Sequence, residues 1–103
     1  MSEDQAFDLP DINQGILDEA TLAQYYQDLE LTRIFAIMVK GGPERYTPEE
    51  SVTLATAREL LAARLCHGIQ IRYIWQQEEW WDTLITTSEG VRLVRIKHAW
   101  EGE

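Results

Sequence analysis

Cys66, His67 and His98 are the side chains in this chain best suited to nucleophilic or metal chemistry. A structural or catalytic metal site needs at least three ligands at workable spacing, and the sequence contains no C-x-x-C, H-x-x-x-H or H-E-x-x-H motif. A catalytic thiol needs electropositive surroundings, which the sequence does not supply around Cys66. The sequence also lacks G-x-S-x-G, P-loop and G-x-G-x-x-G motifs. We therefore assign no catalytic residue, no metal site and no cofactor.

The segment from residue 75 to residue 82, Trp-Gln-Gln-Glu-Glu-Trp-Trp-Asp, is the most unusual in composition. If it lies in a hairpin, Trp80 and Trp81 must point to opposite faces of the sheet, so only one can enter the core. An exposed tryptophan commonly anchors a protein interface, and the surrounding acids favour a partner with an apolar pocket and a basic rim. Alternatively, cross-strand aromatic pairs simply stabilise a small sheet. The predicted partner-binding residues are Tyr73, Trp75, Glu78, Glu79, Trp80, Trp81 and Asp82.

Three predicted strands position these residues. Apolar and polar side chains alternate over residues 69–76, and strand-forming residues continue over 80–87 and 91–98. The connections are short, and Gly90 suits a tight turn, so the three strands should form an antiparallel meander.

Two helices are expected before the meander. The first begins at Asp18 or Thr21 and carries an apolar stripe of Leu22, Tyr25, Tyr26 and Leu29 at helical spacing. The second is predicted from a capping box: Thr47 is the N-cap, Pro48 is the first helical residue, and Glu50 is the third. It should run to about Cys66, with Gly68 as the C-terminal stop.

Residues 31–39 are ambiguous. Leu31, Ile34, Phe35 and Met38 repeat at helical spacing, but they fall on the side opposite to the stripe of the first helix. We favour a helix here, with a strand as the alternative because the segment is rich in β-branched and aromatic residues. Its apolar character on two sides favours a homodimer.

The fold class expected from these elements is α+β, with two helices packed on a three-stranded antiparallel meander and residues 31–39 as an alternative fourth strand. The chain of 103 residues should form one α+β domain over residues 16–100, preceded by a flexible acidic tail over 1–15. A single cysteine, no signal peptide and no apolar run of membrane-spanning length together predict a cytoplasmic protein without a membrane partner.

Charge is unevenly distributed along the chain. The net charge is −9, and the first 30 residues hold eight of the 18 acids and no Lys or Arg. Such an acidic block repels nucleic acid and favours solubility or a basic partner, so we expect no nucleic-acid partner.

These features lead to two main functional hypotheses. The first is a small acidic, non-enzymatic accessory protein, such as an assembly factor, inhibitor or small subunit, that binds another protein. The alternative is a small-molecule-binding domain with an aromatic pocket between sheet and helices, lined by Tyr73, Trp75 and Trp81. A third reading is that the acidic block mimics nucleic acid and thereby occupies a basic protein.

Overall fold

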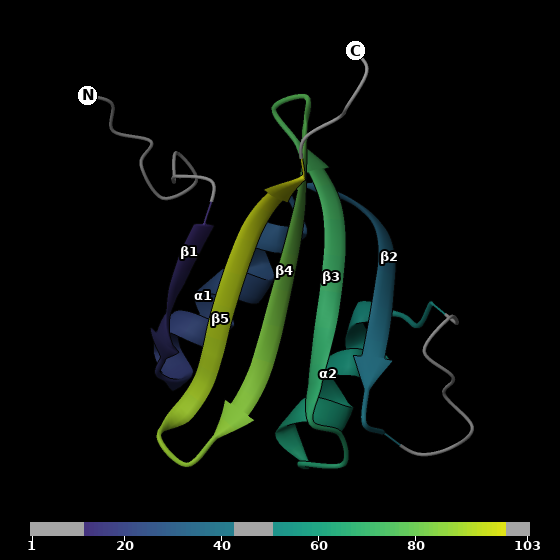
Figure 1. The fold of residues 1–103 in the computed structure, drawn as a ribbon. Helices are drawn as coiled ribbons and strands as arrows, with labels where there is room; N and C mark the ends of the chain where they lie inside the picture. The colour runs from purple at the N-terminus through teal and green to yellow at the C-terminus, as the bar shows by residue number, and fades with distance from the viewer. Residues whose placement is uncertain (1–11, 43–50, 99–103) are drawn as a thin grey trace.

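A computed structural model of the chain describes residues 12–42 and 51–98, and it shows two helices on one face of an antiparallel sheet (Figure 1). The sheet has five strands in the order β1-β5-β4-β3-β2. In sequence order the elements are β1 (Ile12–Leu17), α1 (Glu19–Leu29), β2 (Arg33–Lys40), α2 (Leu54–Ala62), β3 (Gly68–Trp75), β4 (Glu78–Thr87) and β5 (Gly90–His98).

The predicted three-stranded meander is wrong as a description of the whole sheet. The strands β3, β4 and β5 do follow one another as a meander, but β1 extends the sheet beside β5 and β2 extends it beside β3. The two strands that the prediction missed or disfavoured are therefore the two edges. Each edge strand pairs with only one neighbour, and its sequence is less constrained by burial than that of a central strand.

The strand β1 replaces the end of the predicted tail. It pairs antiparallel with β5, from Ile12 opposite Ile96 to Leu17 opposite Val91. Its sequence, INQGIL, includes Asn and Gly, which are poor strand formers. Pairing with β5 outweighs this local preference, which is why the sequence pattern gave no sign of a strand. Residues 1–11 of the predicted tail lie outside the described residues.

The strand β2 occupies the ambiguous segment, so the favoured helix over 31–39 is wrong and the strand alternative is correct. A register shift between Ile34 and Ala36 marks a β-bulge, and Phe35 at the bulge is 49% exposed. The bulge places Ile34 opposite Tyr73 and Ile37 opposite Ile71, so two apolar residues three positions apart face the same core. Of the four residues whose spacing resembled a helix, only Ile34 faces the core, so that spacing does not mark one buried face.

The helix α2 is shorter than expected at both ends. Its N-cap is Thr53, whose side chain accepts a hydrogen bond from the backbone N–H of Thr56, and the predicted cap at Thr47 lies outside the described residues. The helix ends at Ala62, and Arg64 adopts the left-handed conformation that we had assigned to Gly68. For α1, the expected cap at Asp18 is confirmed, because its carboxylate accepts from the Thr21 N–H at 2.7 Å.

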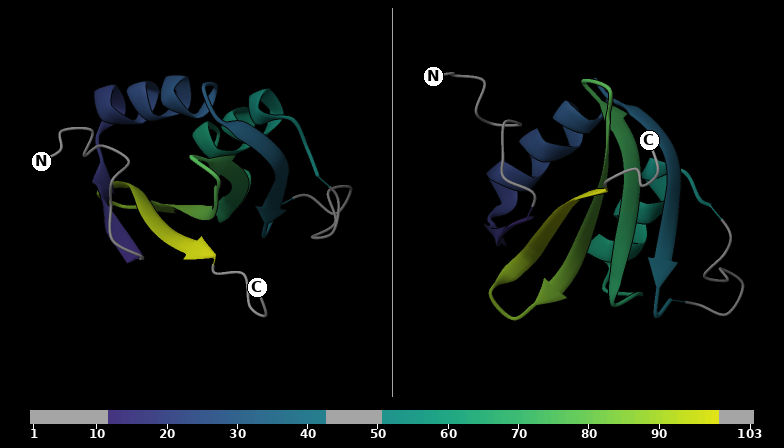
Figure 2. Two further views of the ribbon diagram at one scale, coloured as in Figure 1. Left: turned by 90° about the horizontal axis from the view of Figure 1, so that it is seen from above. Right: turned by 45° about the horizontal axis from the view of Figure 1, so that its top comes forward.

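The core lies between the helices and one face of the sheet, and no described element covers the other face (Figure 2). We call that uncovered side the open face. Neither α1 nor α2 combines the length and apolar content needed to cross a membrane. The largest contributors to the core from the helices are Tyr25, Tyr26, Leu29, Leu60 and Leu61, and those from the sheet include Ile37, Val39, Ile69, Ile71, Tyr73, Trp80, Leu84 and Leu93.

Candidate functional site

The predicted partner-binding residues surround the β3–β4 hairpin, at the top of Figure 1. Trp75 pairs with Glu78, so Gln76 and Gln77 form a two-residue turn, and both have positive φ values of 54° and 68°. Positive φ at both central positions is typical of the turn type whose twist matches that of a hairpin. This turn fixes the register of β4, and consecutive residues of β4 then alternate between the core and the open face.

Three of the predicted residues belong to the core rather than to a surface. Tyr73 and Asp82 are fully buried, and Trp80 is 5% exposed. Trp75, at the end of β3, is partly buried against the same core. Tyr73, Trp80 and Asp82 therefore lie in the core, where a partner protein does not reach them, and Trp75 remains partly exposed.

Asp82 is the centre of a buried hydrogen-bond network. Arg95 Nη2 lies 2.8 Å from Asp82 Oδ2, and Arg95 Nε donates a hydrogen bond to Asp82 Oδ1 at 3.0 Å. The hydroxyls of Tyr25 and Tyr73 donate to Oδ2 at 2.9 and 3.0 Å. The network joins α1, β3, β4 and β5. Because one buried carboxylate satisfies a guanidinium and two phenols, we assign it the role of fixing α1 on the sheet.

The two phenols of this network stay protonated. Burial raises the pKa of Tyr25 well above its ordinary value, and the nearby Asp82 charge raises it further. The pKa of Tyr73 is raised by the same two causes. Both hydroxyls therefore act as donors to Asp82 over the whole physiological pH range.

Trp81 lies on the open face and is held there by three contacts. Its indole N–H donates to the Glu79 carboxylate at 2.7 Å. The Arg72 guanidinium, from β3, lies 3.9 Å from the centroid of the Trp81 ring. The His98 imidazole, from β5, stacks on the same indole with a centroid separation of 4.7 Å and an angle of 4° between the ring planes. Arg72 is itself oriented by a 2.9 Å hydrogen bond from its Nε to Gln70. These contacts hold a half-buried indole in one orientation.

Exposed apolar side chains extend the open face around Trp81. Ile96 is paired directly opposite Trp81 on β5 and is 47% exposed, and Ile85 on β4 is 37% exposed. Ile16, on the edge strand β1, is 46% exposed and pairs with Arg92. On the described part of the open face, Ile96 thus lies beside the aromatic ring, while Ile85 and Ile16 flank Arg92 four residues further along the strands.

The charges on this face differ from the acidic ring that we had expected. Strand alternation sends Asp82 into the core, and Glu79 is only 6% exposed because it lies against the indole. Glu78 is exposed, but it belongs to the hairpin end. The register places four cationic side chains on the open face, namely Arg33, Lys40, Arg72 and Arg92.

The histidines and the cysteine do not converge. His67 precedes β3 and His98 ends β5; since both strands run antiparallel to β4, the two histidines lie at opposite ends of the sheet. Cys66 is buried, and burial raises the pKa of its thiol. Among residues 12–42 and 51–98, no three His, Cys, Asp or Glu side chains are grouped so that they could hold a metal ion.

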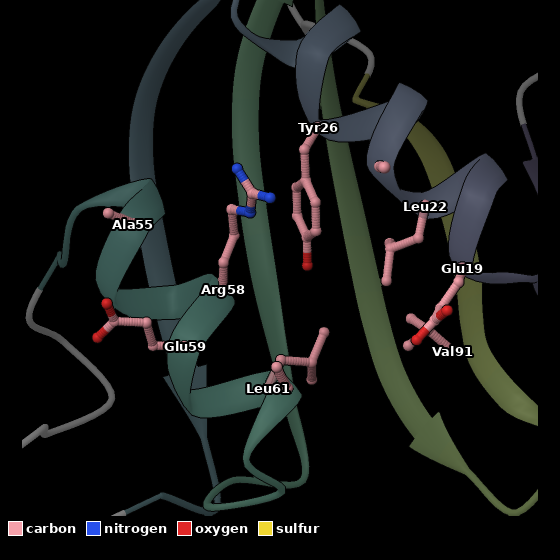
Figure 3. Close-up of a pocket in the computed structure, with 10 residues that line it drawn as sticks. Glu19, Leu22, Tyr26, Ala55, Arg58, Glu59, Leu61 and Val91 are labelled. Carbon is pink, nitrogen blue, oxygen red and sulfur yellow. The ribbon is translucent and has the colours of Figure 1, made fainter.

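A cavity of about 520 Å³ lies between α1 and α2, above the start of β5 (Figure 3). None of Tyr73, Trp75 and Trp81, the predicted pocket residues, lines it. Its walls come from the facing sides of the two helices, and among them only Leu22 and Tyr26 belong to the apolar stripe predicted for the first helix. The lining residues are Glu19, Leu22, Ala23, Tyr26, Ala55, Arg58, Glu59, Leu61, Ala62 and Val91.

Comparison of the chain with protein-family models, with curated proteins and with solved structures found no match.

Proposed function

We propose that this chain is a non-enzymatic accessory protein that binds another protein through the open face of its sheet. The observation that carries the proposal is Trp81, a large aromatic side chain that is only half buried and is oriented by Glu79, Arg72 and His98. Tryptophan and arginine are the residues most enriched at the energetic centres of protein interfaces. An oriented side chain loses little conformational freedom on binding, which favours affinity.

The area around Trp81 supports the same proposal. Ile16, Ile85 and Ile96 are each more than a third exposed and share the open face with the indole. Burial of such aliphatic surface contributes about 25 cal/mol for each Å² removed from water. An aromatic ring with aliphatic and arginine side chains beside it matches the composition in which protein interfaces are enriched.

The charges on the open face define the partner further. Arg33, Lys40, Arg72 and Arg92 make it positive, although the chain carries a net charge of −9. Complementarity therefore favours a partner whose contact surface combines apolar and acidic side chains. In a two-fold symmetric homodimer formed through this face, the same cationic surface would meet itself, which disfavours a second copy as the occupant.

A photo-crosslinking experiment tests this proposal. In one variant a photoreactive phenylalanine analogue replaces Ile96 on the open face. In the control variant it replaces Leu65, which is 58% exposed in the connection after α2. Each variant is expressed in its native cells, irradiated and analysed by mass spectrometry. We expect one covalent adduct with a different protein from position 96 and none from position 65.

Three outcomes contradict the proposal. An adduct from position 65 alone would place the interface on the helical side of the molecule. An adduct with the mass of two copies of the chain from position 96 would make the open face a homodimer interface. No adduct from position 96, in a variant shown by circular dichroism to be folded, would remove the open face as a binding surface.

A further inference from the structure

The cavity between the two helices contains a hydroxyl group that makes no hydrogen bond with the described residues. Tyr26 is 5% exposed, and its ring extends from α1 so that the hydroxyl points into the space between α1 and α2 (Figure 3). Within the part of the chain that the structure describes, this hydroxyl makes no hydrogen bond, unlike those of Tyr25 and Tyr73, which both donate to Asp82. Because this hydroxyl faces the cavity and has no partner in the described part of the protein, it is available to bind a ligand that enters the cavity.

A cation lies beside this hydroxyl group. The Arg58 guanidinium, from α2, lies 4.4 Å from the centroid of the Tyr26 ring, and it makes no ion pair with any residue that the structure describes. Burial raises the pKa of Tyr26 to about 12, so the phenol remains a neutral donor at physiological pH. One side of the cavity therefore offers a donor hydroxyl and a positive charge that is not neutralised by a neighbouring carboxylate.

The rest of the cavity is largely apolar. Leu22 from α1, Leu61 from α2 and Val91 at the start of β5 point toward it, and the remaining small side chains leave its space open. The carboxylate of Glu59 is directed away from the cavity, and Glu19 lies at the end opposite Arg58 (Figure 3). A volume of about 520 Å³ lies within the range of small-molecule sites, which combine an apolar wall with a few polar groups.

We propose that this cavity binds a small amphipathic carboxylic acid, with its apolar part against Leu22, Leu61 and Val91 and its carboxylate near Arg58 and Tyr26. An apolar body matches the aliphatic wall, and a carboxylate accepts hydrogen bonds from both the guanidinium and the phenol. A neutral ligand would use only the hydroxyl, and a cationic ligand would be repelled by Arg58. The inference goes beyond the proposed protein-binding function, because the cavity and the open face lie on opposite sides of the sheet.

Three probes of equal chain length test the ligand class: octanoate, 1-octanol and octylammonium. Binding is followed by NMR titration of the methyl signals of Leu22, Leu61 and Val91. We expect octanoate to give saturable shifts of these signals, octanol to bind roughly tenfold more weakly because it lacks the charge-assisted hydrogen bonds, and octylammonium to give no saturable shift.

Two conservative variants assign the interaction. Tyr26→Phe keeps the ring but removes the hydroxyl, and Arg58→Gln removes an exposed charge. Each variant should weaken octanoate binding by roughly tenfold. Arg58→Gln should leave octanol binding unchanged. The matched control is Arg33→Gln, because Arg33 is exposed on β2 and does not line the cavity.

The inference is overturned if octanoate does not shift the three methyl signals, or if octanoate and octanol bind equally well. It is also overturned if octylammonium binds best, which would make Glu19 the ligand-directing charge, or if Arg33→Gln weakens octanoate as much as Arg58→Gln does. Failure here leaves the crosslinking result at position 96 unaffected, so the two proposals are tested separately.

Discussion

The two faces of β4 show how adjacent residues acquire opposite roles. On the core face, Asp82 is fully buried and its carboxylate binds Arg95, Tyr25 and Tyr73. On the open face, Trp81 is only half buried and its contacts are a cation, an imidazole and one carboxylate. The core network joins four elements and should determine stability. The open-face cluster orients a single, partly buried aromatic side chain on the uncovered side of the sheet and, under the proposed function, should determine binding.

Breaking the core network should have the largest effect on stability. Asp82→Asn removes the charge that pairs with Arg95, and it leaves a 3% exposed guanidinium without its anion. We expect the free energy of unfolding to fall by about 3–5 kcal/mol, the usual cost of breaking a buried ion pair. Urea unfolding followed by circular dichroism measures this change.

The control for Asp82 is Glu78→Gln, because Glu78 is an exposed acid on the same strand. Glu78→Gln should change the free energy of unfolding by no more than about 0.5 kcal/mol. A loss of less than 1 kcal/mol for Asp82→Asn would show that the network does not hold α1 on the sheet.

The adjacent tryptophans provide a matched pair for the two faces. Trp80→Ala creates a cavity in the core and should lower the free energy of unfolding by about 3–5 kcal/mol. Trp81→Ala removes a half-buried ring on the open face and should cost about 1–2 kcal/mol. Denaturant titration of both variants checks the order, and equal losses would contradict the assignment of the two rings to different environments.

Alkaline pH should distinguish the closed tyrosine network from the tyrosine at the cavity. The ordinary pKa of a tyrosine is 10.0, and burial raises that of Tyr26 to about 12 in the folded protein. Between these two pKa values the unfolded chain loses a proton that the folded chain retains. The free energy of unfolding therefore keeps its full contribution from Tyr26 below pH 10 and falls as the pH rises toward 12. Tyr26 alone should contribute about 1.4 kcal/mol of this loss per pH unit.

The variant Tyr26→Phe removes that contribution, while Tyr25 and Tyr73 still destabilise the fold at high pH. We therefore expect Tyr26→Phe to gain stability relative to the unmodified chain between pH 9.5 and pH 11, as measured by urea midpoints at the two pH values. A stability difference that does not change with pH would show that Tyr26 titrates alike in the folded and unfolded states.

The smallest effect on stability concerns the orientation of Trp81. Arg72→Gln removes the cation that lies 3.9 Å from the indole centroid, and it should lower the free energy of unfolding by about 0.5–1 kcal/mol. The indole fluorescence should also change, because the charge next to the ring is lost. A spectrum identical to that of the unmodified chain would indicate that Arg72 does not contact Trp81 in solution.

Sequence reasoning succeeded where local periodicity and burial agree. The three meander strands alternate clearly, and the rule that Trp80 and Trp81 face opposite sides follows from strand geometry alone. It failed at β2, where four apolar residues repeat at helical spacing although only Ile34 among them faces the core, and at β1, where pairing with β5 outweighs weak local propensity.

The candidate site was only partly predictable for a similar reason. Composition identified the hairpin, but only the register shows that Asp82 faces the core and meets Arg95, thirteen residues away in the sequence. The stacking of Arg72 and His98 on Trp81 depends on which strands flank β4. The cavity beside Tyr26 depends on how far apart two helices lie, which no local pattern reports.

The affinity of the partner captured at position 96 tests the open-face proposal most directly. Ile96→Glu places a negative charge beside Trp81, and Leu65→Glu makes the same change at an exposed leucine outside the open face. We predict that Ile96→Glu raises the dissociation constant at least roughly tenfold, because it adds a negative charge to an apolar contact with a partner that carries acidic side chains, whereas Leu65→Glu leaves it unchanged. Equal affinity for both variants, or a larger loss for Leu65→Glu, would show that the open face is not the binding surface.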